Sequence, residues 1–324
     1  MKPETSSQKF HPVFTTIILL ICCLSLAGCI SIGKDGAQNL NYEQMQELQI
    51  QSQYSAVPDD KAIKDALPEM TAHDFEKLGD GYLSKGNPHQ AFVQFEKALN
   101  LDPQNSVIRY KKGLAFLGGH LSQDAIREFE NVLEKKPGFA PALLGMGQAY
   151  FQMKNYDISQ QYCRRALEVD SSLWRAYNFI GMAYDYQDKP DWAIKAYSRA
   201  IFLNPHEGSL YNNLGISYML TADYAKAARA FLKALESGYR TKKVYNNLGL
   251  ALSQLEEYDR ALEAFKKGGN LPIAYNNLGC VLLSQGKSHE ATRYFEKAIA
   301  VDPAFYVKAH DNLKRAKFGF LQKQ

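Results

Sequence analysis

The sequence lacks the short motifs that usually mark a catalytic centre. It contains no His-Glu-x-x-His zinc motif, no Gly-x-Ser-x-Gly nucleophile turn and no Walker-type phosphate loop. Seven histidines are spread over 324 residues, and none has a second histidine three or four positions away. The carboxylates are equally scattered, so pairing any two of them into a site would be arbitrary. We therefore expect that the chain is not an enzyme and holds no metal and no cofactor.

The sequence also has no large excess of basic or acidic residues. The chain has 38 Lys and Arg against 34 Asp and Glu, which gives a formal net charge of +4. The two signs are interspersed, whereas a nucleic-acid-binding protein would concentrate its cations on one face. Hydrophobic residues make up 46% of the chain and charged residues 22%, which is normal for a folded protein. We expect a folded chain with no nucleic-acid partner.

The first apolar run is too short to cross a bilayer comfortably. Residues 13–26 are apolar apart from two threonines and one serine, and they come after a weakly positive start with Lys2 and Lys9. This layout suits the core of a signal peptide. The run ends in Leu-Ala-Gly-Cys at 26–29, which resembles the lipobox of bacterial lipoproteins.

That resemblance implies that residues 1–28 are removed and that Cys29 becomes a lipid-modified N-terminus. In lipoproteins the cysteine sulfur carries a diacylglycerol, and two or more acyl chains anchor stably because each buried CH₂ contributes about 0.8 kcal/mol. Residue 30 is Ile and not the Asp that favours the inner membrane. The resemblance therefore implies the periplasmic face of the outer membrane in a bacterial cell envelope. An uncleaved anchor and an ordinary cleaved signal are the alternatives.

Few cysteines would remain after this processing. Cys163 and Cys280 lie far apart in the sequence, in segments that are not adjacent in the repeat pattern of the chain. A disulfide framework is therefore not supported. We expect both to act as small apolar side chains, with Cys280 accessible to solvent.

Residues 29–71 differ in composition from the remainder of the chain. Gln and Asn cluster between residues 38 and 53, and seven acidic residues outweigh three lysines across 30–71. Low hydrophobicity favours a polar linker that carries the folded part away from the lipid surface. Short helices over 42–53 or 59–67 are the alternative.

After the linker the sequence repeats. A glycine recurs at positions 79, 113, 147, 181, 215, 249 and 279, at five intervals of 34 residues and one of 30. A large apolar residue stands three positions after each glycine, and a small residue stands twelve positions after it. Sixteen positions after the glycines stand Phe95, Phe129, Cys163, Tyr197, Phe231, Phe265 and Phe295.

This period predicts a stack of helix hairpins. Apolar residues three and four positions apart share one helix face. The recurrent glycine lets the second helix approach the first closely, and the small residue twelve positions later does the same from the other side. A single hairpin cannot cover its own apolar face, so neighbouring hairpins are expected to stack.

The pattern resembles the tetratricopeptide repeat (TPR) family. The resemblance implies an all-α, right-handed α-solenoid of seven helix hairpins. Their ranges are 72–105, 106–139, 140–173, 174–207, 208–241, 242–271 and 272–305. Residues 306–324 then form a polar C-terminal capping helix; a basic tail that binds membrane or partner is the alternative. Ser159 and Cys163 in the third repeat predict looser packing, and the short sixth repeat predicts a shortened second helix and a local change of pitch.

In TPR proteins the first helices line a groove that holds extended peptides. Asn213, Asn247 and Asn277 stand where some members carry an asparagine ladder, and an amide can hold a peptide backbone with its donors and acceptor. The preceding asparagines, 178, 212, 246 and 276, could instead bond between neighbouring repeats. We include Asn178 in the expected groove. Lys77 and Lys111 occupy the ladder position in the first two repeats and would favour an acidic segment. Asparagines that satisfy buried polar groups are the structural alternative.

The expected function is a membrane-anchored scaffold for protein–protein interactions in the bacterial envelope. The architecture resembles lipoproteins of type IV and tight-adherence pilus systems (PilF- and TadD-like), which help a secretin to reach or assemble in the outer membrane. An adaptor for peptidoglycan-remodelling enzymes is the alternative. A lipid-anchored enzyme or ligand-binding protein is a third class, which the missing motifs disfavour.

Overall fold

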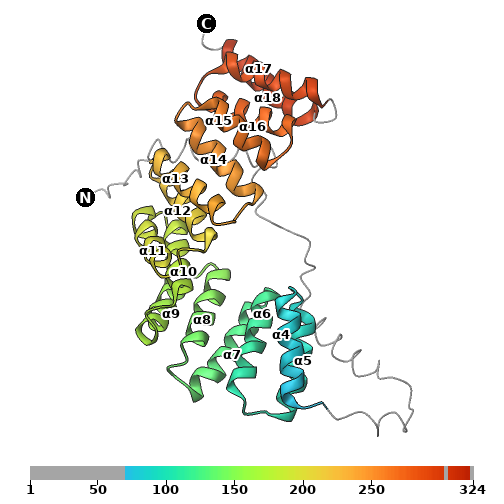
Figure 1. The fold of residues 1–324 in the computed structure, drawn as a ribbon, viewed down its shortest axis with the longest axis vertical. Helices are drawn as coiled ribbons and strands as arrows, with labels where there is room; N and C mark the ends of the chain where they lie inside the picture. Colours follow the sequence, from blue (N-terminus) through green and yellow to red (C-terminus); the bar gives the residue numbers. More distant parts are fainter. Residues whose placement is uncertain (1–69, 303–305, 322–324) are drawn as a thin grey trace, which may run out of the picture. The chain divides into compact units, whose positions relative to one another are not determined.

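The computed structural model describes residues 70–302 and 306–321, and every regular element in these residues is an α-helix (Figure 1). They form two compact units, 70–188 and 189–321 without 303–305. The first unit contains α4 (Ala72–Ser84), α5 (Pro88–Leu101), α6 (Ser106–Gly118), α7 (Ser122–Lys135), α8 (Ala140–Gln152), α9 (Tyr156–Val169) and α10 (Trp174–Tyr186). The second contains α11 (Pro190–Leu203), α12 (Gly208–Leu220), α13 (Tyr224–Glu236), α14 (Lys242–Gln254), α15 (Tyr258–Gly268), α16 (Leu271–Ser284), α17 (Ser288–Val301) and α18 (Tyr306–Leu321). The predicted signal peptide 1–28, Cys29 and the linker up to residue 69 lie outside the described residues.

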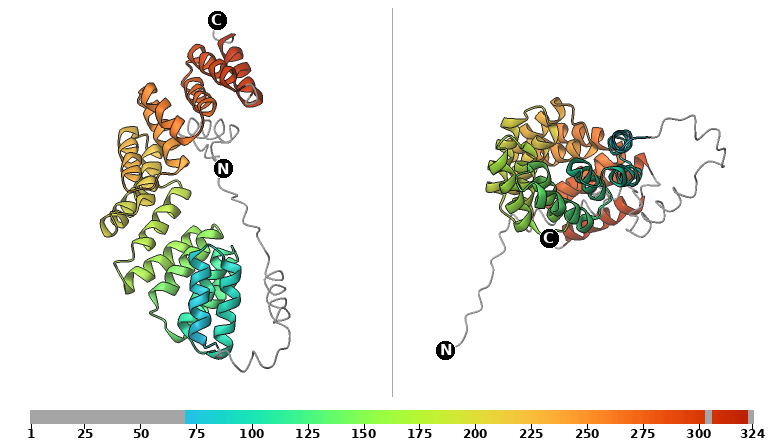
Figure 2. Two further views of the ribbon diagram at one scale, coloured as in Figure 1. Left: turned by 45° about the vertical axis from the view of Figure 1, so that its right-hand side comes forward. Right: turned by 90° about the horizontal axis from the view of Figure 1, so that it is seen from below.

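Within each unit, consecutive helices lie side by side and run in opposite directions (Figures 1 and 2). Each predicted repeat range holds one first helix and one second helix, although α16 begins one residue before the predicted boundary. Second helices also pack on the first helix of the next repeat, as α5 does on α6 and α13 does on α14. The fold is the all-α solenoid of helix pairs that the glycine period predicts.

Five of the repeat glycines lie directly against the phenylalanine sixteen positions later. A Cβ atom built on Gly215 would come within 2.6 Å of Phe231 Cε1, and one on Gly249 within 2.6 Å of Phe265 Cδ1. Both phenylalanine side chains are fully buried. Only a residue without a side chain allows the two helices of a hairpin to pack this closely, which confirms the role predicted for the glycines.

The two unusual residues of the third repeat, Ser159 and Cys163, are both fully buried, and looser packing of this repeat stays a prediction. Cys163 fills the position of the usual phenylalanine, and its Sγ would lie 2.5 Å from a Cβ on Gly147. Ser159 is fully buried and donates a hydrogen bond of 2.7 Å to the carbonyl oxygen of Gly147. The smaller side chains are compensated by a satisfied hydroxyl and a close thiol. Burial raises the pKa of Cys163 to about 12, so this thiol stays protonated.

The described turns inside the hairpins share one residue in the left-handed conformation. After α4, the N–H of Gly86 donates to the carbonyl of Leu83 at 3.0 Å, and the N–H of Asn87 donates to that of Tyr82 at 2.9 Å. This is a Schellman motif, which needs a left-handed residue just after the helix. Gly86 has φ +72°, and the equivalent residues in the later described turns are His120, Lys154, Asp188, Ala222, Glu256 and Gly286, all with positive φ.

The sixth repeat and the C-terminal helix match their predictions in part. α15 has 11 residues whereas α17 has 14, which confirms the shortened second helix. The change of pitch stays a prediction. α18 packs on α17 and α16 with Ala309 and Ala316 fully buried, so it caps the array as expected. Lys317 on its surface lies 3.4 Å from Glu296.

Candidate protein-binding surfaces

Lys111 is held by two carboxylates of the preceding repeat. Its Nζ lies 2.6 Å from Glu76 Oε1 and 2.6 Å from Asp80 Oδ2, both on α4. Although partial burial lowers the pKa of Lys111, the hydrogen bonds that it donates to Asp80 and Glu76 raise this pKa above its usual range. Two carboxylates around one ammonium group give the cluster of Lys111, Glu76 and Asp80 a net negative charge. The expectation that Lys111 would attract an acidic segment is therefore not supported, whereas Lys77 is exposed on α4.

The asparagines form hydrogen bonds between neighbouring repeats. Asn247 on α14 donates through Nδ2 to Oδ1 of Asn212 on α12, at 3.2 Å. Asn212 in turn donates to Oδ1 of the adjacent Asn213, at 3.3 Å. Both Asn213 and Asn247 remain half-buried, so part of each side chain still faces solvent. The row of amides therefore ties repeats together, and its use as a peptide clamp stays a prediction.

At the end of the row the asparagines are fully enclosed. Asn277 has no exposed surface, and α16 contacts α14, α17 and α18. The place of Asn277 in a peptide-binding groove stays a prediction. Asn312 of α18 donates through Nδ2 to Oδ1 of the buried Asn276 at 3.0 Å and lies 3.4 Å from Cys280 Sγ. The prediction of an accessible Cys280 is wrong, since only 2% of this residue is exposed.

The fourth repeat departs from the asparagine pattern. Asn178 is half-buried on α10, and its Nδ2 lies 3.5 Å from the Sδ of Met182 one helical turn along. The ladder position beside it is occupied by Phe179. A side chain without hydrogen-bonding groups replaces the amide at this point of the first unit.

An aromatic cluster surrounds that position. The ring centroid of Phe151 on α8 lies 5.5 Å from that of Tyr156 on α9, 5.7 Å from Phe179 and 5.6 Å from Tyr186, both on α10. Tyr156 and Tyr186 stack at 5.1 Å with an angle of 11° between their rings. Sequence analysis missed these four residues as a group, which we call the aromatic cluster. A count of aromatics at the ends of neighbouring first helices would have found two of them.

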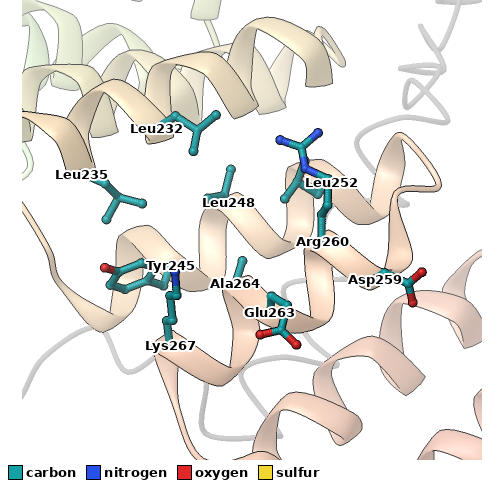
Figure 3. A pocket seen from close by; sticks show the side chains of 10 residues that line it. All are labelled: Leu232, Leu235, Tyr245, Leu248, Leu252, Asp259, Arg260, Glu263, Ala264 and Lys267. Carbon is teal, nitrogen blue, oxygen red and sulfur yellow. The ribbon is translucent and has the colours of Figure 1, made fainter.

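The second unit has an apolar groove between α13, α14 and α15 (Figure 3). Its volume is about 360 Å³. Leucines from α13 and α14 face one another across it, and charged side chains of α15 flank them. The lining residues are Leu232, Leu235, Tyr245, Leu248, Leu252, Asp259, Arg260, Glu263, Ala264 and Lys267. The groove lies beside the shortened second helix of the sixth repeat, and the sequence pattern predicted that helix but not the groove.

Metal-binding and membrane-spanning features are both missing from residues 70–302 and 306–321. These residues contain no group of three or more His, Cys, Asp or Glu side chains arranged to hold a metal ion. None of their helices has the length and apolar character needed to cross a bilayer.

Comparison with protein families matches almost every part of the repeat region. Models of the tetratricopeptide repeat match residues 76–105, 122–176, 174–207, 213–268 and 272–305. Together these matches cover more than half of the chain.

Curated relatives share only segments with the chain. Human Superkiller complex protein 3 is 29% identical over 114 residues, which are 35% of this chain and 6% of that protein. The type IV pilus assembly protein PilF of Pseudomonas aeruginosa is 26% identical over 138 residues, which are 41% of this chain and 54% of that protein. The match thus spans less than two thirds of either relative.

Solved structures show the same fold at lower identity. The structure of Pseudomonas aeruginosa PilF aligns with a TM-score of 0.53 and 22% identity, over 60% of this chain and 88% of that one. The APC/C hetero-tetramer Cut9–Hcn1 aligns with a TM-score of 0.57 and 18% identity, over 94% of this chain and 55% of that one. The family matches, the glycine period and the stacked hairpins agree, and this chain belongs to the tetratricopeptide repeat family of protein-interaction scaffolds.

Proposed function

We propose that this chain is a membrane-anchored scaffold that holds other proteins during pilus or secretin assembly in a bacterial envelope. The observation that carries the scaffold is the set of half-buried amide and aromatic side chains on the first helices, such as Asn213, Asn247 and Phe179. These groups can bond or stack with an extended segment without a large change of the protein backbone.

The anchor rests on the Leu-Ala-Gly-Cys sequence at 26–29 and on the polar linker after it. A diacylglycerol on Cys29 would tie the scaffold to a bilayer, with Ile30 favouring the periplasmic face of the outer membrane. The pilus pathway is supported by the partial similarity to PilF, a type IV pilus assembly protein. Each of these points can fail without the others.

The anchor is tested on the mature protein from bacterial membranes. Mass spectrometry of the N-terminal peptide should show acyl chains on Cys29, and a Cys29→Ser variant should lose them and leave the membrane fraction. An intact residue 1, or an unmodified Cys29, would contradict the anchor but would leave the scaffold untouched.

The partner is tested by photo-crosslinking in cells. A benzophenone amino acid placed at Asn213 or Asn247 should crosslink to a defined partner, whereas the same group at Lys233, on the exposed side of α13, should not. A secretin or pilus subunit in the crosslinked band supports the proposal. A cell-wall hydrolase would replace it with the alternative adaptor function, and equal crosslinking at Lys233 would remove the binding surface altogether.

A further inference from the structure

The aromatic cluster of Phe151, Tyr156, Phe179 and Tyr186 keeps one ring open to solvent. Phe151 is surrounded by the other three rings, but 65% of Tyr186 is exposed. Tyr156 stacks on one face of the Tyr186 ring, so the exposed surface must include the opposite face. A flat, open π-face backed by Tyr156 and flanked by Phe151 is a platform on which a planar group can stack.

Charged groups of both signs lie beside this platform, and the acid Asp157 is fixed there by a hydrogen bond. Asp157 comes directly after Tyr156, and its Oδ1 accepts a 2.8 Å hydrogen bond from Nε2 of Gln187, the residue after Tyr186. Gln160 donates in turn to Oε1 of Gln187 at 3.2 Å, which fixes the orientation of that amide. The Asp157 carboxylate is therefore held close to the stacked tyrosines. Asp188 is a second exposed acid in the adjoining turn, where Lys154 and Lys189 are the exposed cations.

We propose that the aromatic cluster is a subsite for an arginine side chain on a basic, extended segment of a partner protein. The inference rests on the proposed scaffold function and names the chemistry of the partner. A guanidinium is planar and weakly hydrated, so it stacks on an aromatic face and still directs its N–H fork at a carboxylate. A lysine ammonium is compact and strongly hydrated, and it gains less from the same arrangement.

Lys111 in the first unit is bound by Glu76 and Asp80, so its charge does not oppose a basic partner. The N-terminal segment of the chain itself does not fit the subsite, because residues 1–69 contain no arginine and 30–71 carry more acids than lysines. The matching segment therefore belongs to another protein.

The test uses the full-length protein in detergent and three fluorescein-labelled peptides. The peptides are Gly-Ser-Arg-Ala-Arg-Gly-Ser, the same sequence with lysines, and the same sequence with neutral citrullines. Fluorescence anisotropy should give about tenfold tighter binding for the arginine peptide than for the lysine peptide. Citrulline should bind weakest, because it stacks without a charge. Equal affinities for arginine and lysine would overturn the subsite and leave a general acidic surface.

Variants locate the binding. Tyr186→Ala should lower the affinity for the arginine peptide about tenfold, Tyr186→Phe should retain it, and Asp157→Asn should lower it and weaken its dependence on salt. Phe202→Ala removes another strongly exposed ring, on α11, and should change nothing. Circular dichroism checks that each variant keeps its helices. Unchanged affinity in Tyr186→Ala overturns the proposal.

The test of the arginine subsite can succeed or fail independently of the tests of the proposed function. Loss of peptide binding in Tyr186→Ala supports the subsite even if Cys29 carries no lipid. Crosslinking of a secretin at Asn213 supports the envelope scaffold even if the three peptides bind alike.

Discussion

Lys112 Nζ on α6 lies 2.5 Å from Glu96 Oε2 on α5, and this ion pair is mostly enclosed within the first unit. The same Nζ lies 3.1 Å from Glu128 Oε1 on α7, and Arg109 approaches the other oxygen of Glu128 at 3.2 Å. Only 12% of the Lys112 side chain is exposed. Although burial lowers the pKa of Lys112, the carboxylates of Glu128 and Glu96 raise it above its usual range. Two cations and two acids thus join three helices of the first two repeats.

Lys112→Met should destabilise the first unit by about 3 kcal/mol, because it leaves two partly buried carboxylates without their shared cation. The loss should be measured by urea unfolding at neutral pH. It should shrink as the pH falls, since protonated carboxyls no longer repel each other. Lys233→Met is the control: its partner Glu236 is exposed, and we expect a change below about 0.5 kcal/mol. Similar losses in both variants would mean that the burial of the Lys112 ion pairs does not increase their contribution to the free energy of unfolding.

Substitution of two glycines of α4 distinguishes the effect of close packing on stability from the effect of helix propensity. A side chain on Gly79 would overlap the ring of the buried Phe95, so Gly79→Ala should lower the unfolding free energy by about 2 kcal/mol. No atom lies within 4 Å of a Cβ built on Gly81, so Gly81→Ala should raise it by about 0.5–1 kcal/mol. Thermal unfolding of both variants measures the difference. Shifts of the same sign would contradict the close packing of the hairpin.

The left-handed residue of the turn gives a reciprocal pair of variants. Gly86 has φ +72° and nothing within 4 Å of a built Cβ, so Gly86→Ala should cost about 1 kcal/mol through backbone strain alone. Ala222 already has a side chain at φ +58°, so Ala222→Gly should gain up to about 1 kcal/mol. Melting temperatures should move in opposite directions. A loss in Ala222→Gly, or no change in Gly86→Ala, would show that the turn tolerates alanine without strain.

His89 should make the first unit sensitive to acid. Burial lowers its pKa below the ordinary value of 6.5, and no described residue accepts or donates a hydrogen bond at its buried Nδ1. The unfolded chain then binds the proton more readily than the folded one, so stability falls as the pH drops below about 6.5. In His89→Gln the melting temperature should fall less between pH 7 and pH 5 than in the unmodified protein. Parallel curves would refute this source of acid sensitivity.

The capping helix α18 can be followed through a thiol. Asn312→Ala removes the donor that reaches Asn276 and covers Cys280, so α18 should open more often. Labelling of Cys280 by a maleimide should accelerate about tenfold, which corresponds to about 1.4 kcal/mol. Peptide mapping by mass spectrometry separates it from the buried Cys163, which should label as slowly as before. An unchanged rate at Cys280 would mean that the Asn312 contacts do not hold the cap.

The hairpins could be predicted because their main contacts recur at fixed spacing. Gly215 and Phe231 stand sixteen residues apart in one repeat, and the same pair of residue types returns at Gly249 and Phe265. A contact inside one repeat leaves a period in the sequence, so counting positions is enough to find it.

The binding surfaces could be predicted only in part, because their contacts cross from one repeat to the next. Sequence alone placed Asn247 in a row of amides, but its bond to Asn212 depends on how far the two first helices lie apart. The neutralisation of Lys111 by Glu76 and Asp80 has the same origin. The aromatic cluster combines residues of two first helices and one second helix, and the stacking of Tyr156 on Tyr186 depends on how these helices lie together.

The short helix α15 indicates where a repeat can change its length. An α-helix turns by about 100° per residue, so three residues missing from its end remove nearly one turn and leave every earlier side chain pointing as before. Phe265 accordingly keeps its place against Gly249. The same loss in the middle of α15 would displace Phe265 along the axis and separate it from that glycine. Evolutionary insertions and deletions in this chain are therefore expected to accumulate at the trailing ends of second helices, where a repeat can be trimmed without rebuilding its interior.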